Sequence, residues 1–325
     1  MRTRARLAAA LLALAAAACS GGGGPGTTPT SGRPAAGGTA DLGNVARVER
    51  RAFPAGGGSG VAASSRHPGV LWAIRDRGGK SKPGRPQDAL YAYKVAGGQV
   101  VDVAPGAAFA AVPVEGATPR DWEDIARDGD GNIWIADIGN NECDRTDTAL
   151  LKVPEPEPAP GATAHVAATY HYRFPDPPAG CAGKNAEAMF IVDGVPYVID
   201  KTDRSTVYRF PRLDPHGTVT LQRVGTLSGP GGGPVATLSG ADLSSDSRLL
   251  AVDTHTELYV YQASDPAARG QALVADLIGH PPRWKAELGS PANVEGVGFG
   301  FGSHDLNLLA ENRDVYWLPG SALEG

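Results

Sequence analysis

Five copies of one pattern recur along the chain, and this repeat restricts the fold more than any other feature of the sequence. In each copy a short apolar run is followed by a second run that ends at or beside an acid, and then by a third. The apolar anchors of the first runs are Val61, Ile125, Met189, Leu243 and Val297, so successive copies lie 64, 64, 54 and 54 residues apart. Units of this length exceed the coils of a parallel β-helix and match the four short strands of a propeller blade.

The number of runs predicts a propeller whose ring is closed by the N-terminal strand. A looser fourth run follows the third in the first four copies, at residues 100–114, 166–174, 219–227 and 272–278, and the last copy has none. Residues 45–53 precede the first copy and have no partner of their own. We therefore predict an all-β fold, a β-propeller of five four-stranded blades. Six blades are the alternative, because residues 100–119 are long enough to contain extra strands.

Composition agrees with this fold and narrows the range of partners. The 44 glycines and 27 prolines favour short strands joined by turns over long helices. The formal charge of −5 argues against a nucleic-acid partner, because phosphate binding needs a basic patch. No interior segment has the roughly 20 consecutive apolar residues of a membrane-spanning helix. We expect a globular monomer.

The N-terminal residues have the pattern of a bacterial lipoprotein signal peptide, residues 1–19. Three arginines precede an apolar run that is too short to span a bilayer. The residues Ala16 to Cys19 resemble a lipobox, in which the cysteine becomes the acylated N-terminus. The alternative is cleavage at an Ala-x-Ala site, which would give a secreted protein.

A tether and a single domain are predicted to follow the signal peptide. Residues 20–41 consist mostly of Gly, Pro, Thr, Ser and Ala, which cannot offset the entropy of ordering, so they predict a disordered tether. Residues 42–325 form the predicted propeller domain. We expect this domain to face outside the cytoplasm and to reach the cell membrane only through its lipid anchor.

Cys143 and Cys181 are the two cysteines that remain once Cys19 is set aside. An exported protein meets oxidising conditions, in which paired cysteines form disulfides. In the predicted topology Cys143 lies in a loop of the second blade and Cys181 in the connection into the third, on the same face of the ring. We predict a Cys143–Cys181 disulfide at the rim of that face.

The predicted topology also brings two sets of acids to one mouth of the central channel, since the chain enters each first strand and leaves each second strand on the same face. The acids before the first-strand anchors are Glu123, Asp124, Glu187, Asp242 and Glu295. The acids at the ends of the second runs are Asp76, Asp137, Asp200, Asp253 and Glu311. Carboxylates that lie close together need cations, protons or basic partners.

We predict a divalent-cation site at this mouth. The candidate ligands are Glu123, Asn185, Glu187, Asn293, Glu295, Asp137, Asp200 and Asp253. Carboxylate and amide oxygens are the ligands of hard cations, so Ca²⁺ is the expected ion, with other divalent cations as the alternative. For the second-run acids a structural role competes with this one, in which each accepts hydrogen bonds from backbone N–H groups of its own loop.

Other chemical signals in the sequence are weak. Asp128 to Asn132 have the first spacings of an EF-hand loop, but Ile133 and Gly139 stand where that loop needs Gly and Glu, so we predict a hairpin turn. No Gly-x-Ser-x-Gly nucleophile motif occurs. His255 follows Asp253 on the acidic face and is the one candidate general base; no other catalytic residue is assigned.

Three stretches carry a resemblance to known proteins. Trp122-Glu-Asp-Ile-Ala, Ile133-Trp-Ile-Ala-Asp-Ile-Gly-Asn-Asn141 and Asn185-Ala-Glu-Ala-Met189 resemble exported bacterial β-propeller proteins of unassigned function. More distantly, the chain is similar to the gluconolactonase-like, NHL-repeat and phytase-like esterase propellers. The resemblance to lactonases implies a divalent metal in the channel mouth with Glu, Asn and Asp ligands, although their motifs do not match this chain residue by residue.

Two functions from different classes fit these observations. The first is a surface-tethered module that binds an extracellular small molecule or protein at a calcium-bearing mouth. The alternative is a metal-dependent hydrolase of a lactone or phosphoester. The lack of nucleophile and base motifs favours binding, and whether the chain is an enzyme stays open at this point.

Overall fold

The fold is described by a computed structural model over residues 38–49, 52–54, 56–76, 88–202, 204–289 and 293–324. The predicted signal peptide, the lipidation site Cys19 and the predicted tether up to residue 37 lie outside these residues. Strand β1 (Ala40–Asn44) begins two residues before the predicted start of the domain at residue 42.

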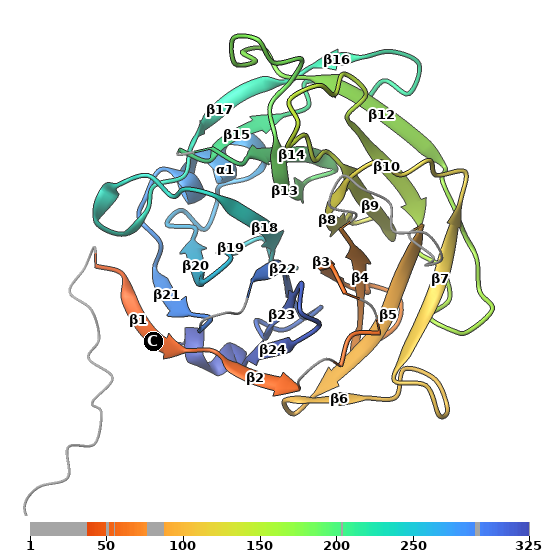
Figure 1. Ribbon diagram of the computed structural model, residues 1–325. Helices are drawn as coiled ribbons and strands as arrows, with labels where there is room; N and C mark the ends of the chain where they lie inside the picture. Colours follow the sequence, from red (N-terminus) through yellow and green to blue (C-terminus); the bar gives the residue numbers. More distant parts are fainter. Residues whose placement is uncertain are drawn as a thin grey trace, which may run out of the picture. The chain divides into compact units, whose positions relative to one another are not determined.

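The described residues form five small sheets arranged in a ring, a five-bladed β-propeller (Figure 1). The first blade consists of β3 (Gly58–Ala63), β4 (Val70–Arg75), β5 (Ala89–Ala96) and β7 (Phe109–Glu115); the second of β8 (Trp122–Arg127), β9 (Asn132–Asp137), β10 (Ala149–Pro154) and β12 (Ala168–Arg173). The third consists of β13 (Ala186–Val192), β14 (Val195–Asp200), β15 (Thr206–Arg209) and β17 (Gln222–Thr226); the fourth of β18 (Leu238–Leu243), β19 (Leu249–Thr254), β20 (Glu257–Gln262) and β21 (Trp284–Glu287). The fifth consists of β22 (Val294–Phe299), β23 (Leu306–Ala310), β24 (Val315–Leu318) and β2 (Ala46–Glu49).

The N-terminal strand closes the ring as predicted. Strand β2 pairs antiparallel with β24 and completes the fifth blade. The preceding strand β1 pairs parallel with β21, so the N-terminal segment joins two neighbouring blades. Residues 100–119 contribute β7 and part of the short β6 (Gln99–Val101), which pairs with β5, and the described residues form five blades rather than six.

Connecting segments add outer strands to two blades. Strand β11 (Ala164–His165) pairs parallel with β7, and β16 (Val219–Thr220) pairs parallel with β12. Short 3₁₀ turns occur at Pro230–Gly232 and Gly320–Leu323. The burial pattern follows position in the blade: β3 is buried throughout, whereas the outer strand β7 alternates between buried and less buried residues. This difference is expected because an inner strand is covered on both faces.

The five first strands contact one another around the ring axis, each touching the next. Their backbones approach closely, and glycine makes this possible. A Cβ atom at Gly296 would lie 2.6 Å from the backbone nitrogen of Gly60 in the neighbouring blade. The approach of the first strands holds the residues at their ends in defined positions relative to one another.

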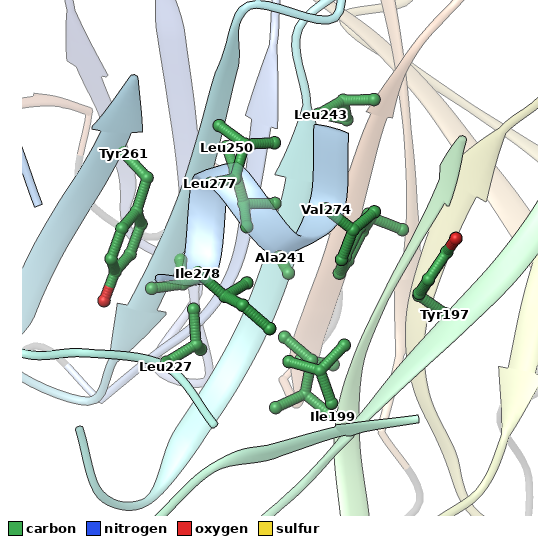
Figure 2. Close-up of a cluster of buried hydrophobic side chains, with 14 of the residues drawn as sticks. Tyr197, Ile199, Leu227, Ala241, Leu243, Leu250, Tyr261, Val274, Leu277 and Ile278 are labelled. Atoms are coloured by element: carbon green, nitrogen blue, oxygen red, sulfur yellow. The ribbon is translucent and has the colours of Figure 1, made fainter. Parts of the chain in front are cut away.

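One segment predicted to be a strand, residues 272–278, is instead part of a helix. Residues 272–278 belong to α1 (Gly270–Ile278), and the fourth strand of that blade is β21 instead. Leu273, Val274, Leu277 and Ile278 are buried, and this i, i+1, i+4, i+5 spacing places them on one face of a helix. Figure 2 shows three of these side chains among the hydrophobic residues between the third and fourth blades.

The predicted disulfide is present between Cys143 and Cys181, whose Cα atoms lie 5.0 Å apart. It links the loop after β9 to the connection into β13. Asp128 to Asn132 form the predicted turn between β8 and β9, and Asp128 Oδ1 accepts the backbone N–H groups of Asp130 and Asn132 at 3.0 and 2.9 Å. None of the helices in the described part of the chain has the length and apolar character that crossing a membrane requires.

Candidate functional site

Every first strand contains a β-bulge, and three of the five acids predicted before the first-strand anchors are bulge residues. Asp242, predicted at the same mouth, lies instead in a cavity with Arg127, at the other end of the inner strands. Read from the strand register, the bulge residues are Gly60, Glu123, Glu187, Ser239 and Glu295. A bulge adds one unpaired residue and re-aims its side chain. In the fourth blade the bulge residue is Ser239. It lies two positions before Ala241, the residue that the spacing from the anchor Leu243 predicts.

Each of the five blades contributes at least one carboxylate to this end of the ring. We define the acidic mouth as Asp76, Glu123, Glu187, Asp253 and Glu295. One carboxylate oxygen from each of Asp76, Glu123 and Glu295 lies within 4.8 Å of the other two. This separation allows three carboxylates from three blades to contact a single metal ion.

Glu123 has fewer hydrogen-bond donors and positive groups around it than the other acids of the mouth have. It is 3% exposed, and no described residue donates a hydrogen bond to its carboxylate or forms an ion pair with it. Burial, and then the neighbouring carboxylates with Glu187 first, raise the pKa of Glu123 well above its usual range. A side chain at Gly139 would collide with the carboxylates of Asp121 and Glu123, so glycine leaves the space beside them open.

Lys201 supplies positive charge to the mouth from the loop after β14. Its Nζ contacts the carboxylate of Glu187. Burial raises the pKa of Glu187, and Lys201 opposes that rise. Burial lowers the pKa of Lys201, but attraction to Glu187 and to the other mouth carboxylates outweighs it and raises that pKa overall. Lys201 is therefore an internal cation at one side of the mouth.

Glu295 has a histidine partner. His255 Nε2 lies 3.2 Å from Glu295 Oε1, and the His255 side chain is 40% exposed. This contact with Glu295 is the main reason that the pKa of His255 is raised. Ser59 Oγ lies within hydrogen-bond distance of the backbone oxygens of Glu123 and Glu295, at 2.5 and 3.1 Å. The neighbouring first blade thus helps to position both glutamates.

Asp253 is fully buried, and apart from its own amide no described group donates a hydrogen bond to either of its oxygens. Burial, followed by the charge of Glu295, raises the pKa of Asp253 well above its usual range. A Cβ atom at Gly240 would lie 2.7 Å from Asp253 Oδ1, so glycine opposite it provides the necessary space. The hydroxyl of the nearby bulge residue Ser239 is also buried without a partner.

Strand register separates Asp253 from the other second-run acids. Asp137 pairs with Trp122 and Asp200 pairs with Ala186, the residues just before the bulges, whereas Asp253 pairs with Gly240, just after one. Asp253 is therefore one position earlier in its strand. Because neighbouring positions on a strand point to opposite faces, Asp253 points away from the loop of its own blade.

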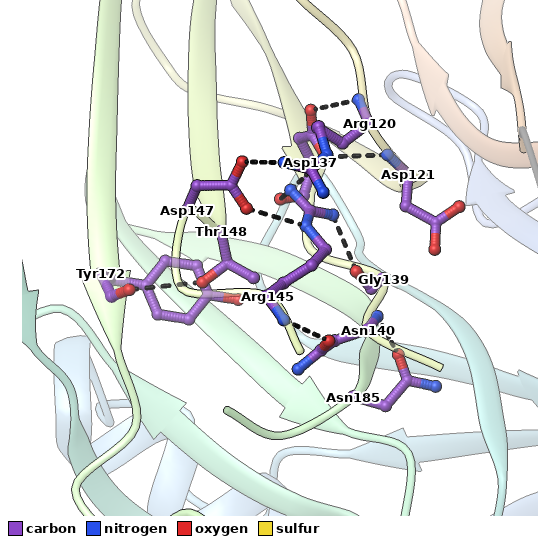
Figure 3. Close-up of polar contacts among 10 residues, drawn as sticks. All are labelled: Arg120, Asp121, Asp137, Gly139, Asn140, Arg145, Asp147, Thr148, Tyr172 and Asn185. Carbon is purple, nitrogen blue, oxygen red and sulfur yellow. Dashed lines mark hydrogen bonds and ion pairs between the residues drawn. The ribbon is translucent and has the colours of Figure 1, made fainter. Parts of the chain in front are cut away.

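Asp137 is surrounded by hydrogen-bond donors of its own blade (Figure 3). It accepts the backbone N–H groups of Arg120 and Asp121 at 2.9 and 3.0 Å, and Arg145 Nη2 lies 2.8 Å from its Oδ1. Arg145 also donates to the Gly139 carbonyl at 2.7 Å. These contacts are those expected if Asp137 organises the loop after β9.

Asp200 has an equivalent set of partners in the third blade. It accepts the backbone N–H of Thr206 at 2.8 Å and the hydroxyl of Thr202 at 2.9 Å, and Lys184 Nζ lies 3.0 Å from its Oδ2. Asp137 and Asp200 both have the loop contacts that the competing, structural role predicts for second-run acids.

The two candidate amides lie beside the acidic mouth and are bonded to protein groups. Asn185 Nδ2 lies 3.0 Å from Glu187 Oε1, and its Oδ1 accepts the backbone N–H of Asn140 at 2.6 Å. Asn293 Nδ2 donates to Glu311 Oε2 at 2.8 Å. In this arrangement the amides orient neighbouring side chains.

Asp124, next to Glu123, connects three blades. Its Oδ2 accepts the backbone N–H groups of Met189 and Ala241, at 2.8 and 3.2 Å, and its Oδ1 accepts that of Ile125 at 2.8 Å. Burial raises the pKa of Asp124, and these backbone hydrogen bonds oppose the rise. The geometry assigns Asp124 to the assembly of the ring.

Asp76 and Lys201 are the mouth residues that the predicted ligand set omitted. The first blade has glycine at its bulge. Its carboxylate comes instead from Asp76, which lies two residues after Ile74, the partner of Ser59. The acid at the end of the second run was the available signal for Asp76. For Lys201, the signal was a basic residue directly after Asp200.

Comparisons with known proteins support no closer identification. No protein-family model matches the chain, and no curated protein matches it. A glutaminyl cyclase from Myxococcus xanthus is 11% identical with a TM-score of 0.47, over 84% of this chain and 97% of the other. A gluconolactonase from Xanthomonas campestris is 13% identical with a TM-score of 0.39, over 88% and 98%. Likeness at this level carries no argument about activity, and the propeller fold rests on the five sheets themselves.

Proposed function

We propose that this chain is a binding module whose acidic mouth holds a divalent cation. The observation that carries the proposal is the environment of Glu123, a buried carboxylate that receives no hydrogen bond from the described residues and lies close to Asp76 and Glu295. Three acids so placed repel one another at the effective dielectric of a protein interior. A bound cation removes that repulsion and supplies the contacts that Glu123 lacks.

The donor set favours Ca²⁺ over softer metals. The three closest ligands are carboxylate oxygens, and Ca²⁺ accepts six to eight oxygens in flexible geometry. Three carboxylates leave several coordination positions for water and for oxygen atoms of a ligand. The mouth therefore suits a ligand that is recognised through the cation.

A cavity beside the mouth provides room for such a ligand. It has a volume of about 250 Å³, and its lining includes Asp121, Asn140 and Arg145. The side-chain nitrogen of Asn140 is buried without an acceptor. We propose that an extracellular small molecule or a segment of a protein binds here, with an oxygen atom directed to the cation.

The cellular setting belongs to the same proposal. The lipoprotein signal and Cys19 support a domain anchored to the outer side of the cell membrane by lipid, with secretion as the alternative. The disulfide is consistent with an oxidising compartment. We propose a monomeric domain.

Metal content and binding calorimetry test the cation site. Protein purified without chelator is expected to carry one divalent ion per chain, and the double variant Glu123→Gln, Glu295→Gln is expected to carry none. Glu115→Gln is the matched control, because Glu115 is an exposed glutamate on β7. A double variant that keeps the metal content of the wild type would contradict the proposal.

A hydrolase is the second candidate, and the contact between His255 and Glu295 favours it. His255 is exposed enough to meet a substrate and lies against a proposed ligand of the cation. A divalent ion supplies Lewis-acid polarisation of a lactone or phosphoester, and His255 in its neutral form would accept a proton from water. Hydrolysis of a lactone or a phosphoester that falls at least 100-fold in His255→Gln, with unchanged calcium binding, would establish this function. Equal activity in wild type and variant would exclude His255 as the base.

A further inference from the structure

A second cavity lies at the opposite end of the inner strands. It has a volume of about 350 Å³ and is lined by residues at the ends of β8, β13 and β18 and in the hairpin turns that follow them. Glu123 and Arg127 lie near opposite ends of β8, so this cavity is separate from the acidic mouth. Its volume falls within the range of small-molecule sites.

Arg127 is the positive group of this cavity, and one of its donors has no acceptor. Its Nε is buried without an acceptor, and no described carboxylate forms an ion pair with its guanidinium. Guanidinium presents five N–H donors in a planar fork that matches a carboxylate. A buried donor without an acceptor is costly, so the arrangement favours a ligand that supplies one.

Phe301 fixes the position of this guanidinium. The Arg127 Cζ atom lies 5.0 Å from the centroid of the Phe301 ring, and Phe301 itself is 51% exposed. Ser245 Oγ accepts the backbone N–H of Gly302 at 3.1 Å and so holds the turn that carries the ring. An exposed aromatic side chain that stacks on an unpaired arginine is expected at a preorganised binding site.

Two acids of the cavity, Asp128 and Asp193, already form hydrogen bonds with other parts of the protein. Asp128 is bonded to Asn132, Trp134 and Lys152 and contributes little free charge. Asp193 accepts the backbone N–H of Gly270 at 3.0 Å through Oδ2.

Asp242 and Asp130 complete the acidic lining. Asp242 accepts the backbone N–H of Phe299 at 2.8 Å, and burial raises its pKa to about 7 although Arg127 opposes the rise. Asp130 is exposed. One unpaired cation therefore faces several carboxyl groups that can still accept hydrogen bonds, which disfavours a doubly charged phosphate and favours a ligand with a single negative charge and several donors.

We propose that this cavity binds a small molecule with one carboxylate and several hydrogen-bond donors. The carboxylate contacts the Arg127 guanidinium, and hydroxyl or ammonium groups at the other end donate to the aspartates. Sugar acids and α-amino acids share this chemistry. The site does not depend on cation binding at the acidic mouth.

Calorimetric titration with D-glucuronate, L-alanine and D-glucose tests the proposal. We expect glucuronate, alanine or both to bind, and glucose, which has no carboxylate, to bind at least tenfold more weakly. Binding of only one acid identifies the sugar-acid or the amino-acid class. Arg127→Gln is expected to weaken binding roughly tenfold or more, because charge-assisted hydrogen bonds are lost. Phe301→Ala, at an exposed position, is expected to weaken it several-fold without affecting folding.

Arg66→Gln is the matched control, because Arg66 donates to the Glu155 carbonyl and does not line the cavity. It is expected to bind as the wild type does. The proposal is overturned if neither acid binds, if glucose binds as tightly as glucuronate, or if folded Arg127→Gln and Phe301→Ala both bind as tightly as the wild type.

Discussion

Replacing Lys201 with methionine removes the internal cation of the acidic mouth and keeps most of the side-chain volume. Lys201 contacts Glu187, and their side chains are 20% and 4% exposed. Two unit charges about 4 Å apart at an effective dielectric of about 20 attract by about 4 kcal/mol. Because Lys201 is partly exposed, we expect Lys201→Met to lower the free energy of unfolding by about 3 kcal/mol when divalent cations are removed.

The same substitution is expected to strengthen calcium binding. Lys201 also interacts with Glu123 and Glu295, so its ammonium repels a cation held between them. Even at the dielectric of water and a separation of about 8 Å, an ammonium and Ca²⁺ repel by about 1 kcal/mol. We therefore expect Lys201→Met to bind Ca²⁺ at least about fivefold more tightly, and excess Ca²⁺ to restore most of the lost stability.

Urea unfolding with EDTA or CaCl₂ and calorimetric titration with Ca²⁺ measure the two effects. Lys152→Met is the matched control: Lys152 Nζ lies 3.2 Å from the buried Asp128, and the lysine side chain is 25% exposed. This control is expected to lose stability without any change in calcium affinity. If Lys201→Met binds Ca²⁺ no more tightly than the wild type, the cation is not held beside Lys201 and the reasoning is refuted.

Three further predictions concern the ring and the titration of its acids. Asp124→Ala leaves two buried backbone N–H groups of neighbouring blades without acceptors and is expected to cost about 2–6 kcal/mol in urea unfolding; a loss below 1 kcal/mol would argue against its role in ring assembly. Replacing Cys143 and Cys181 with serine is expected to cost about 3–4 kcal/mol by the chain-entropy model, measured in the same way, and an unchanged midpoint would contradict this. Glu123 and Asp253 have raised pKa values in the folded protein, so the stability they contribute is full below their unfolded pKa and is lost as pH rises through the folded one. In EDTA the free energy of unfolding should therefore fall as the pH rises above about 4.5, the usual pKa of a glutamate, Ca²⁺ should suppress the fall, and a rise in EDTA would contradict the prediction.

The five blades could be predicted from the sequence because each repeat has buried apolar anchors at similar spacing. Val61, Ile125, Met189 and Val297 are all fully buried in first strands. The closing strand could be predicted because residues 45–53 had no other partner. Residues 272–278 were assigned to a strand because their apolar character was noted without their helical spacing.

The candidate site could be predicted only in part, because strand register cannot be read from spacing alone. Glu123, Glu187 and Glu295 occupy the same bulge position, so their repeat in the sequence corresponds to a repeat in space. Asp137 and Asp253 end similar apolar runs but differ by one register position, and their side chains therefore have different surroundings. The distinction depends on the bulge at each first strand, for which the sequence carries no separate signal.

The most direct test of the cation site is a crystal structure of the protein grown with Ca²⁺, with an anomalous difference map. We predict a peak between the carboxylates of Asp76, Glu123 and Glu295, at a distance of about 2.3–2.6 Å from an oxygen of each. A map without a peak there, in which Glu123 is contacted only by water, would contradict the proposed role of the acidic mouth.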